Sequence, residues 1–148
     1  MTEADIACAA IKWLTWQGFD CYSEVPCYGG RADIVAVRQS VIWIVETKIA
    51  LTAELCIQCR DRLREPCNGV LAVASGKSNR DGHPLIEWLS GHGIGFARVH
   101  PHSTGFDLHQ LPSLRRVNNE KLRARLHEQQ KKNVAGTSGN SQTDRGRA

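Results

Sequence analysis

Two spacings of apolar residues run through the first 112 residues of the chain. Near the start, Ile6, Ala10 and Trp13 recur every three or four residues, which predicts one apolar face of a helix. Elsewhere the apolar residues stand in short runs bounded by Gly, Pro and polar residues, which is typical of strands. These spacings predict helices over residues 3–17, 52–65 and 85–90, and strands over residues 19–25, 31–38, 41–45, 70–74 and 94–100.

The order of these elements indicates an α/β fold. Residues 41–45 and 70–74 are wholly apolar, so both strands should be buried on both faces of a sheet. A helix separates them, and a strand–helix–strand connection usually joins parallel strands. The three strands up to residue 45 follow one another through short turns, as in an antiparallel meander. We therefore expect a mixed sheet flanked by helices.

The charge of the chain changes after residue 112. Residues 1–112 contain 10 Lys and Arg against 12 Asp and Glu, whereas residues 113–148 contain 9 against 3. Residues 114–132 predict one charged helix, and the polar composition of residues 133–148 predicts disorder. We therefore expect a domain over residues 1–112 and a basic helix with a disordered tail over residues 113–148. Such an end can bind a phosphate backbone or remain solvated without a partner.

The start of the chain lacks the features of a signal peptide, and no apolar run reaches the about 18 residues of a membrane span. We therefore expect a cytoplasmic protein with no membrane partner. In that compartment most of the six cysteines should be reduced and packed in the core. Cys56 and Cys59 form a C-x-x-C with Cys67 nearby, so a structural or metal-storing protein is an alternative.

The most informative feature is a set of charged residues within apolar strands. Asp33 lies in the apolar strand of residues 31–38, and Glu46 and Lys48 follow directly after residues 41–45. Alternate residues of a strand point to one face, so Glu46 and Lys48 should point the same way. A hairpin between the two strands would bring Asp33 beside Glu46. Because a buried carboxylate is costly unless it is paired or bound to metal, these three residues form a candidate site.

A divalent metal ion would account for this arrangement. The carboxylates of Asp33 and Glu46 suit Mg²⁺ or Mn²⁺, and the main-chain carbonyl of Thr47 is a further candidate ligand. Such an ion lowers the pKa of a bound water, which then becomes a nucleophile near neutral pH. Lys48 would orient that water or neutralise charge in the transition state. The alternative is a plain salt bridge at the end of a sheet.

Asp33, followed after twelve residues by Glu46-Thr47-Lys48, resembles the signature of the PD-(D/E)xK nuclease superfamily. This superfamily includes restriction endonucleases, archaeal Holliday-junction resolvases, and repair and phage nucleases. The helix–Gly-Phe–strand opening and the Asp-Ile-Val-Ala-Val run resemble the resolvase-like branch, although Arg31-Ala32 stands where the family name has Pro. The resemblance covers residues 3–75. It implies a restriction-endonuclease-like αβββαβ core and metal-dependent hydrolysis of DNA. We expect an endonuclease, with exonuclease action as the alternative.

The resemblance also implies further site residues. The resolvase-like branch has an acidic residue in its first helix, for which Glu3 is the candidate, and often a Gln after the Glu-x-Lys strand, for which Gln58 is the candidate. A first-turn Glu is also explained by the helix dipole alone. Glu24 is a rival acidic residue, with a surface charge as its alternative. Gln58 shares a helix face with Arg62, four residues on.

Several cationic residues are candidates for contacts to DNA phosphates: Arg31, Arg62, Arg115 and Arg116. No aromatic residue is interleaved with the arginines of the basic end, so the sequence does not support stacking on a single strand there. RNA stays open as a substrate. A small domain of this type often works as a dimer, so a homodimer is also an expectation. The alternative to an active nuclease is a catalytically idle nuclease-fold protein that binds nucleic acid.

Overall fold

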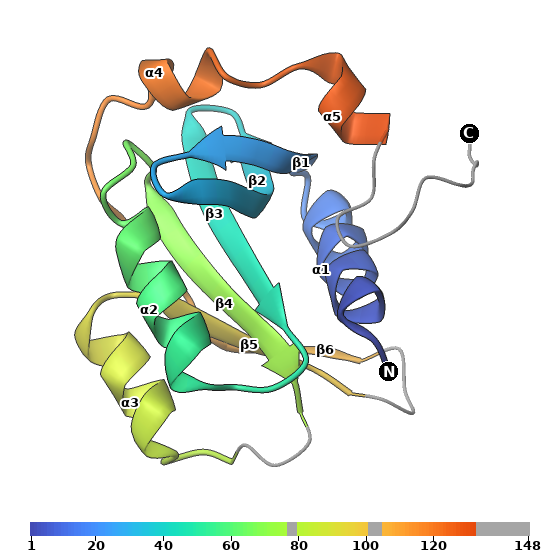
Figure 1. Cartoon of the computed structure of the whole chain (residues 1–148), viewed down its shortest axis with the longest axis vertical. Coiled ribbons are helices and arrows are strands. Elements are labelled where there is room, and N and C mark those ends of the chain that lie inside the picture. Colours follow the sequence, from blue (N-terminus) through green and yellow to red (C-terminus); the bar gives the residue numbers. More distant parts are fainter. Residues whose placement is uncertain (77–79, 101–104, 133–148) are drawn as a thin grey trace.

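A computed structural model describes residues 1–76, 80–100 and 105–132 of the chain. One six-stranded sheet forms its centre, with α1 on one face and α2 and α3 on the other (Figure 1). Within the described residues, no helix is both long and apolar enough to cross a membrane. The elements are α1 (Glu3–Trp16), β1 (Asp20–Cys27), β2 (Gly30–Arg38), β3 (Val41–Lys48), α2 (Ala53–Arg62), β4 (Gly69–Ser75), α3 (Pro84–Gly91), β5 (Gly95–Val99), β6 (Phe106–Gln110), α4 (Glu120–Arg123) and α5 (Glu128–Lys132).

The sheet is mixed and its strands lie in chain order, from β1 to β6. Strands β1, β2 and β3 form an antiparallel meander, β3, β4 and β5 are parallel, and β6 returns antiparallel to β5. Helix α2 is the crossover between β3 and β4, and α3 is the crossover between β4 and β5. The prediction of an α/β fold with a mixed sheet flanked by helices is therefore confirmed.

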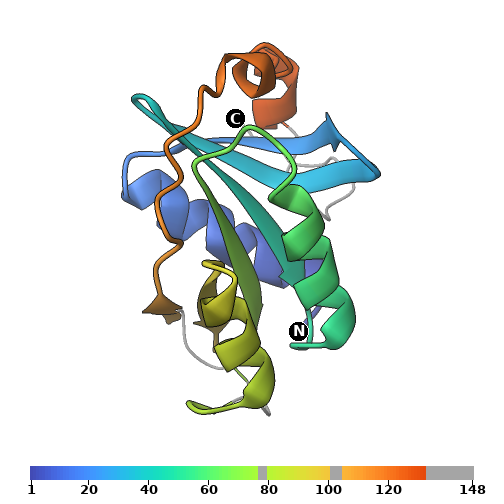
Figure 2. The same cartoon turned by 90° about the vertical axis from the view of Figure 1, so that its left-hand side faces the viewer.

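The two faces of the sheet bury two separate apolar clusters, which explains the unbroken apolar run of β3. Ile42 and Ile44 pack into the cluster beneath α2 and α3, whereas Val45 packs into the cluster beneath α1. Figure 2 shows the sheet between α1 behind it and the pair α2 and α3 in front. A strand covered on both sides needs apolar residues at successive positions, so a charged residue in β3 is exceptional.

Two strands differ from their predicted extent. The first strand was expected to stop before Pro26, but β1 continues to Cys27, and Pro26 pairs with Arg31. Strand β1 lies at the edge of the sheet, where the missing N–H of a proline is tolerated. Strand β6 was not predicted. Only one of its faces is apolar, through Phe106 and Leu108, and five residues give too little alternation to stand out from a loop.

The prediction of one charged helix over residues 114–132 is wrong. Residues 111–119 form neither helix nor strand, and within the described residues only the short helices α4 and α5 follow. The amide nitrogen of Asn119 donates to the carbonyl of Ser40 and to Oδ1 of Asn68, both at 2.7 Å. Leu122 is fully buried in the cluster beneath α2. Residues 113–132 therefore pack onto the domain, and the predicted disordered tail, 133–148, lies outside the described residues.

Candidate functional site

The candidate site lies where β2 and β3 separate. Their paired residues end at Ile34 and Val45, so the next facing positions are Asp33 and Glu46. There the Asp33 carboxylate accepts hydrogen bonds from the amide of Thr47, at 2.9 Å, and from its hydroxyl, at 3.3 Å. A side-chain oxygen thus bonds to β3 two residues beyond its last paired residue, Val45. This holds the half-buried carboxylate of Asp33 between the two strands, beside Glu46.

Glu46 lies on the face of β3 that packs against α2, two residues beyond Ile44. Its side chain is 3% exposed, and one of its oxygens accepts a hydrogen bond from Nε of Arg62 at 2.9 Å. Arg62 also donates to the carbonyls of Tyr28, at 3.1 Å, and Arg31, at 2.9 Å. One guanidinium therefore connects α2, β3 and the turn between β1 and β2.

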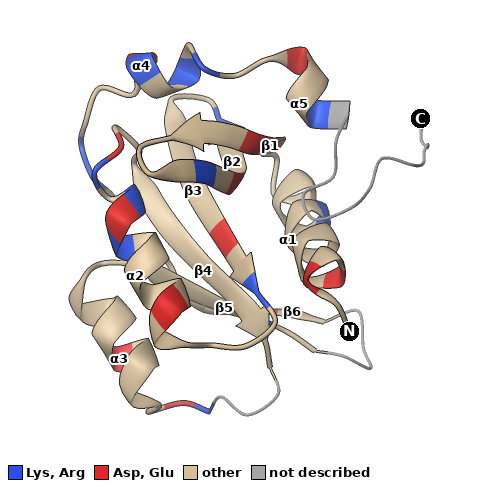
Figure 3. Cartoon of the chain, in the orientation of Figure 1, with Lys and Arg blue, Asp and Glu red and all other residues tan. Residues whose placement is uncertain are grey.

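The carboxylates of this region repel one another. Burial, followed by the charge of Asp33, raises the pKa of Glu46 to about 7 against the opposing effect of Arg62. Burial also raises the pKa of Glu24, with contributions from the charges of Asp33 and Glu3. Asp33 thus raises the pKa of both glutamates, and this region favours the binding of positive charge. In Figure 3 the charged positions at the end of β3 lie between α2 and the acidic first turn of α1.

Glu24 occupies a distorted point of β1 opposite Asp33. The register runs through Ser23 with Ile34 and Val25 with Ala32, which leaves Glu24 facing Asp33. The φ of Glu24 is 56°, a left-handed conformation that a residue with a side chain rarely adopts in a strand. Such strain persists where the surrounding structure enforces it, often at functional sites. The distortion and the electrostatic link to Asp33 distinguish Glu24 from an ordinary surface charge.

Lys48 and α2 complete the surroundings of the two carboxylates. The ammonium of Lys48 lies 3.6 Å from a carboxylate oxygen of Glu54. Residues four apart on a helix share a face, so Glu54, Gln58 and Arg62 lie along one face of α2. Glu54 contacts Lys48 and Arg62 binds Glu46, which places Gln58 between these two contacts. The structure therefore gathers most of the predicted site residues around the ends of β2 and β3: Asp33, Glu46, Thr47, Lys48 and Gln58, with Glu24 and Glu3 linked to them electrostatically.

The predicted phosphate-binding arginines are not gathered in the same way. Arg115 donates to the carbonyls of Glu65 and Cys67 at 3.3 Å, near the start of β4 and away from the end of β3. Arg116 is exposed on the same irregular segment, residues 111–119. Arg62 is buried against Glu46 instead of facing solvent. The sequence contained one sign that Arg62 points toward Glu46, because Arg62 shares a helix face with Gln58 and Glu54.

Three of the six cysteines, Cys56, Cys59 and Cys67, pack in the core, whereas Cys8 is exposed and Cys21 and Cys27 are partly buried. Cys56 and Cys59 lie on the inward face of α2 and belong to the cluster beneath it, as does Cys67. Burial raises the pKa of Cys67 to about 11, so its thiol is protonated near neutral pH. Across residues 1–76, 80–100 and 105–132, no three His, Cys, Asp or Glu side chains converge so that they alone could hold a metal ion.

The raised pKa of Glu46 predicts a pH effect on stability. The folded chain holds a proton on Glu46 up to pH of about 7, whereas the unfolded chain releases it near the ordinary pKa of 4.5. Between these values the folded state binds more protons, so the contribution of Glu46 to stability falls as pH rises. Urea unfolding from pH 4 to 8 should show this fall for the wild type and a flatter curve for Glu46→Gln. Parallel curves for the two proteins would contradict the assignment.

No protein-family model matches the chain, and no curated protein matches it. Among solved structures, the chain is similar to SPO1766, a protein of unknown function from Silicibacter pomeroyi. The two have a TM-score of 0.61 and 15% sequence identity, over 85% of this chain and 84% of that chain. At this identity the similarity shows a shared fold alone.

Proposed function

We propose that this chain is a metal-dependent nuclease that hydrolyses DNA phosphodiester bonds, with Asp33 and Glu46 as the metal ligands. The observation that carries the proposal is the meeting of Asp33 and Glu46 at the point where β2 and β3 separate. Glu46 follows a run of apolar residues in β3 and is buried, and its pKa is raised although Arg62 lies beside it. A buried carboxylate with a raised pKa beside a second carboxylate is a candidate for function rather than for stability.

The donor set fits Mg²⁺ or Mn²⁺. Mg²⁺ sites in enzymes of phosphate chemistry commonly use one or two carboxylates, with waters and substrate oxygens completing the shell. Asp33 and Glu46 supply two carboxylates, one oxygen of Glu46 is bound by Arg62, and the carbonyl of Thr47 is a further candidate. A metal bound here would lower the pKa of a water and withdraw charge from the phosphate.

The other residues act on the same reaction. Lys48, two residues beyond Glu46 on the same face of β3, would stabilise the charge that develops on the phosphate oxygens. Glu54 lies 3.6 Å from the Lys48 ammonium and connects it to α2. Gln58, between these contacts, would orient a water or a ligand carboxylate. Glu24 and Glu3 are candidates for an additional acidic ligand, since the charges of Asp33 and Glu3 both act on Glu24.

The arrangement of elements supports the finer assignment to a restriction-endonuclease-like core of the PD-(D/E)xK type. The chain runs α1, β1, β2, β3, α2 and β4, with the acidic residues on the second and third strands. This is the order that the resemblance implies for residues 3–75. The sheet then continues through β5 and β6 beyond that core.

A second candidate function rests on the ion pair between Glu46 and Arg62. If Arg62 permanently neutralises Glu46 in place of a metal, the chain is a nuclease-fold protein that binds nucleic acid without cutting it. This alternative differs from the first only in catalysis. A cleavage assay therefore separates the two.

The test is a cleavage and binding assay on the wild-type chain. We expect cleavage of single-stranded or double-stranded DNA in Mg²⁺ or Mn²⁺, and no cleavage in EDTA. RNA of the same sequence serves as a parallel substrate. Binding without cleavage in either metal would favour the idle protein over the nuclease. Cleavage that persists in EDTA would overturn the proposed metal dependence.

A further inference from the structure

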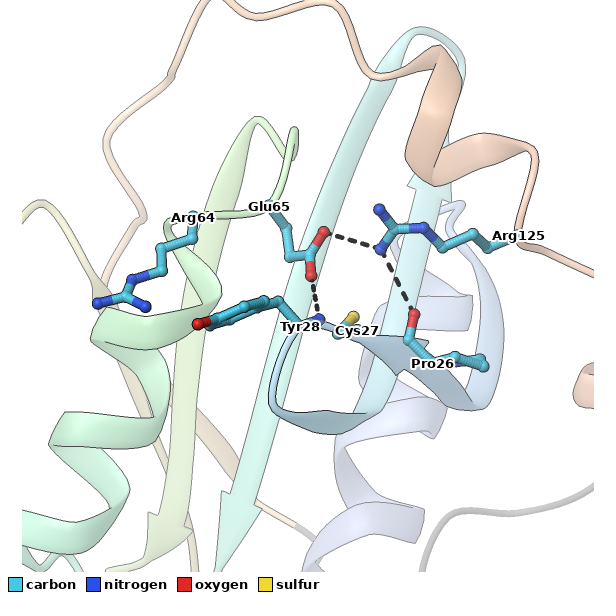
Figure 4. A pocket seen from close by; sticks show the side chains of 6 residues that line it. All are labelled: Pro26, Cys27, Tyr28, Arg64, Glu65 and Arg125. Carbon is cyan, nitrogen blue, oxygen red and sulfur yellow. Dashed lines mark hydrogen bonds and ion pairs between the residues drawn. The ribbon is translucent and has the colours of Figure 1, made fainter.

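An aromatic side chain stands beside the candidate site, at the turn between β1 and β2. The Tyr28 side chain is 66% exposed, although large aromatic residues are usually mostly buried. Tyr28 lines an open cavity of about 500 Å³, within the usual size range of small-molecule sites. Figure 4 shows this cavity with the side chains of Arg64, Glu65 and Arg125 around Tyr28.

The cavity carries a net positive charge at its rim. The guanidinium of Arg64 lies over the Tyr28 ring, 5.4 Å from its centre. Nη1 of Arg125 binds a carboxylate oxygen of Glu65 at 2.7 Å and the carbonyl of Pro26 at 3.4 Å. Glu65 thus balances the charge of one arginine, which leaves one positive charge in excess. A guanidinium has five N–H donors, and both contacts of Arg125 use the same nitrogen.

A buried carboxylate holds the cavity in shape. Glu65 is 4% exposed, and its second oxygen accepts a hydrogen bond from the amide of Tyr28. Its pKa is lowered, through the hydrogen bond from Tyr28 and then through Arg125, which together outweigh the effect of burial. The tyrosine and the arginine are therefore fixed to one anchor, although they lie almost one hundred residues apart in the chain.

Arg62 connects this cavity to the candidate metal site. The same guanidinium that binds Glu46 donates to the carbonyl of Tyr28 at 3.1 Å. Only one side chain thus separates the backbone of Tyr28 from the carboxylate of Glu46. A DNA strand bound with one phosphodiester bond at Glu46 would have a neighbouring nucleotide within reach of the Tyr28 ring.

We propose that Tyr28, Arg64 and Arg125 form a subsite for an unpaired nucleotide next to the bond that is cut. An exposed aromatic ring stacks on any free base, and arginines bind the adjoining phosphates. In a duplex the bases are already stacked on one another, so a side chain on the outside cannot use their faces. The subsite rests on the proposed function for its neighbouring bond, and it specifies the substrate class as single-stranded or locally unpaired DNA.

The test measures binding without catalysis. Fluorescence anisotropy in EDTA would follow a labelled single-stranded oligothymidine of about 12 nucleotides, within the span of single-strand sites. We expect Tyr28→Ala to weaken binding roughly tenfold and Tyr28→Phe to stay within about twofold, since phenylalanine keeps the ring. Arg64→Ala should weaken binding and lower the dependence on salt concentration by about one phosphate contact. Arg60→Ala, on an exposed residue of α2, is the matched control and should change neither.

Several binding results would overturn the subsite. They include equal affinities of wild type and Tyr28→Ala for the single strand, an equal loss with a duplex of the same length, and no binding of the oligonucleotide at low salt. Displacement of the oligonucleotide by an acidic peptide with higher affinity would instead indicate a protein partner, and would also overturn it. Because the assay contains no metal, absence of cleavage leaves these outcomes unchanged. If the Tyr28→Ala variant cleaved DNA at the wild-type rate, the proposed subsite would be wrong and the proposed nuclease function would still stand.

Discussion

Replacing Asp33 by asparagine is expected to reduce metal-dependent DNA cleavage by about two to three orders of magnitude. Asparagine has the same shape, and its side-chain oxygen can still accept the hydrogen bonds from Thr47. The change therefore removes the negative charge of a metal ligand with little effect on the ends of β2 and β3. Initial cleavage rates in Mg²⁺ and Mn²⁺, with the unfolding midpoint measured alongside, would give the result.

The matched control for this prediction is Asp20→Asn. The Asp20 side chain is 68% exposed and lies 3.9 Å from Lys131, at the other end of β1 from the candidate site, so the cleavage rate of this variant should match that of the wild type. Lys48→Ala should also lose activity, because the ammonium at the end of β3 is removed. Wild-type rates for Asp33→Asn in both metals would reject Asp33 as a ligand. An unfolded Asp33→Asn would be replaced by Asp33→Ser, which keeps a hydroxyl oxygen for Thr47.

Replacing Arg62 by alanine is expected to destabilise the chain by about 3–5 kcal/mol, the range seen when one partner of a buried ion pair is removed. The side chains of Arg62 and Glu46 are only 8% and 3% exposed, so solvent screens the pair little. The change leaves Glu46 without its cation and removes the donor from the carbonyls of Tyr28 and Arg31. Urea unfolding at pH 8, where Glu46 is ionised, would measure the loss.

A double-mutant cycle isolates the ion pair from the other contacts of Arg62. In the Glu46→Gln background, Arg62→Ala should be less destabilising, because no buried charge is left uncompensated. Arg60→Ala, whose partner Asp61 is also exposed, should change stability by less than about 0.5 kcal/mol. Equal losses for Arg62→Ala in both backgrounds would show that the guanidinium acts through the β1–β2 turn and not through Glu46.

The parts of the fold that the sequence predicted are those with a local signal. The helical periodicity of α1 and the unbroken apolar runs of β3 and β4, which are buried on both faces, depend only on neighbouring positions in the sequence. The same locality placed Glu46 and Lys48 on one face of β3. The segment after residue 112 was wrongly predicted to be one helix, because its charged residues suit an exposed helix. In the structure, contacts with residues distant in the chain hold Asn119 and Leu122 instead.

By itself, the sequence determined that charged residues would follow the apolar run of β3, and that Asp33 would come beside them through a hairpin. Those conclusions follow from strand alternation and from short turns, which act over a few residues. Only the tertiary structure decided that Arg62 turns inward to Glu46, that Glu24 faces Asp33 in a strained conformation, and that Arg125 meets Tyr28 through Glu65. These contacts join residues far apart in the chain, so they depend on how α2, α4 and the β1–β2 turn pack, which no local pattern records.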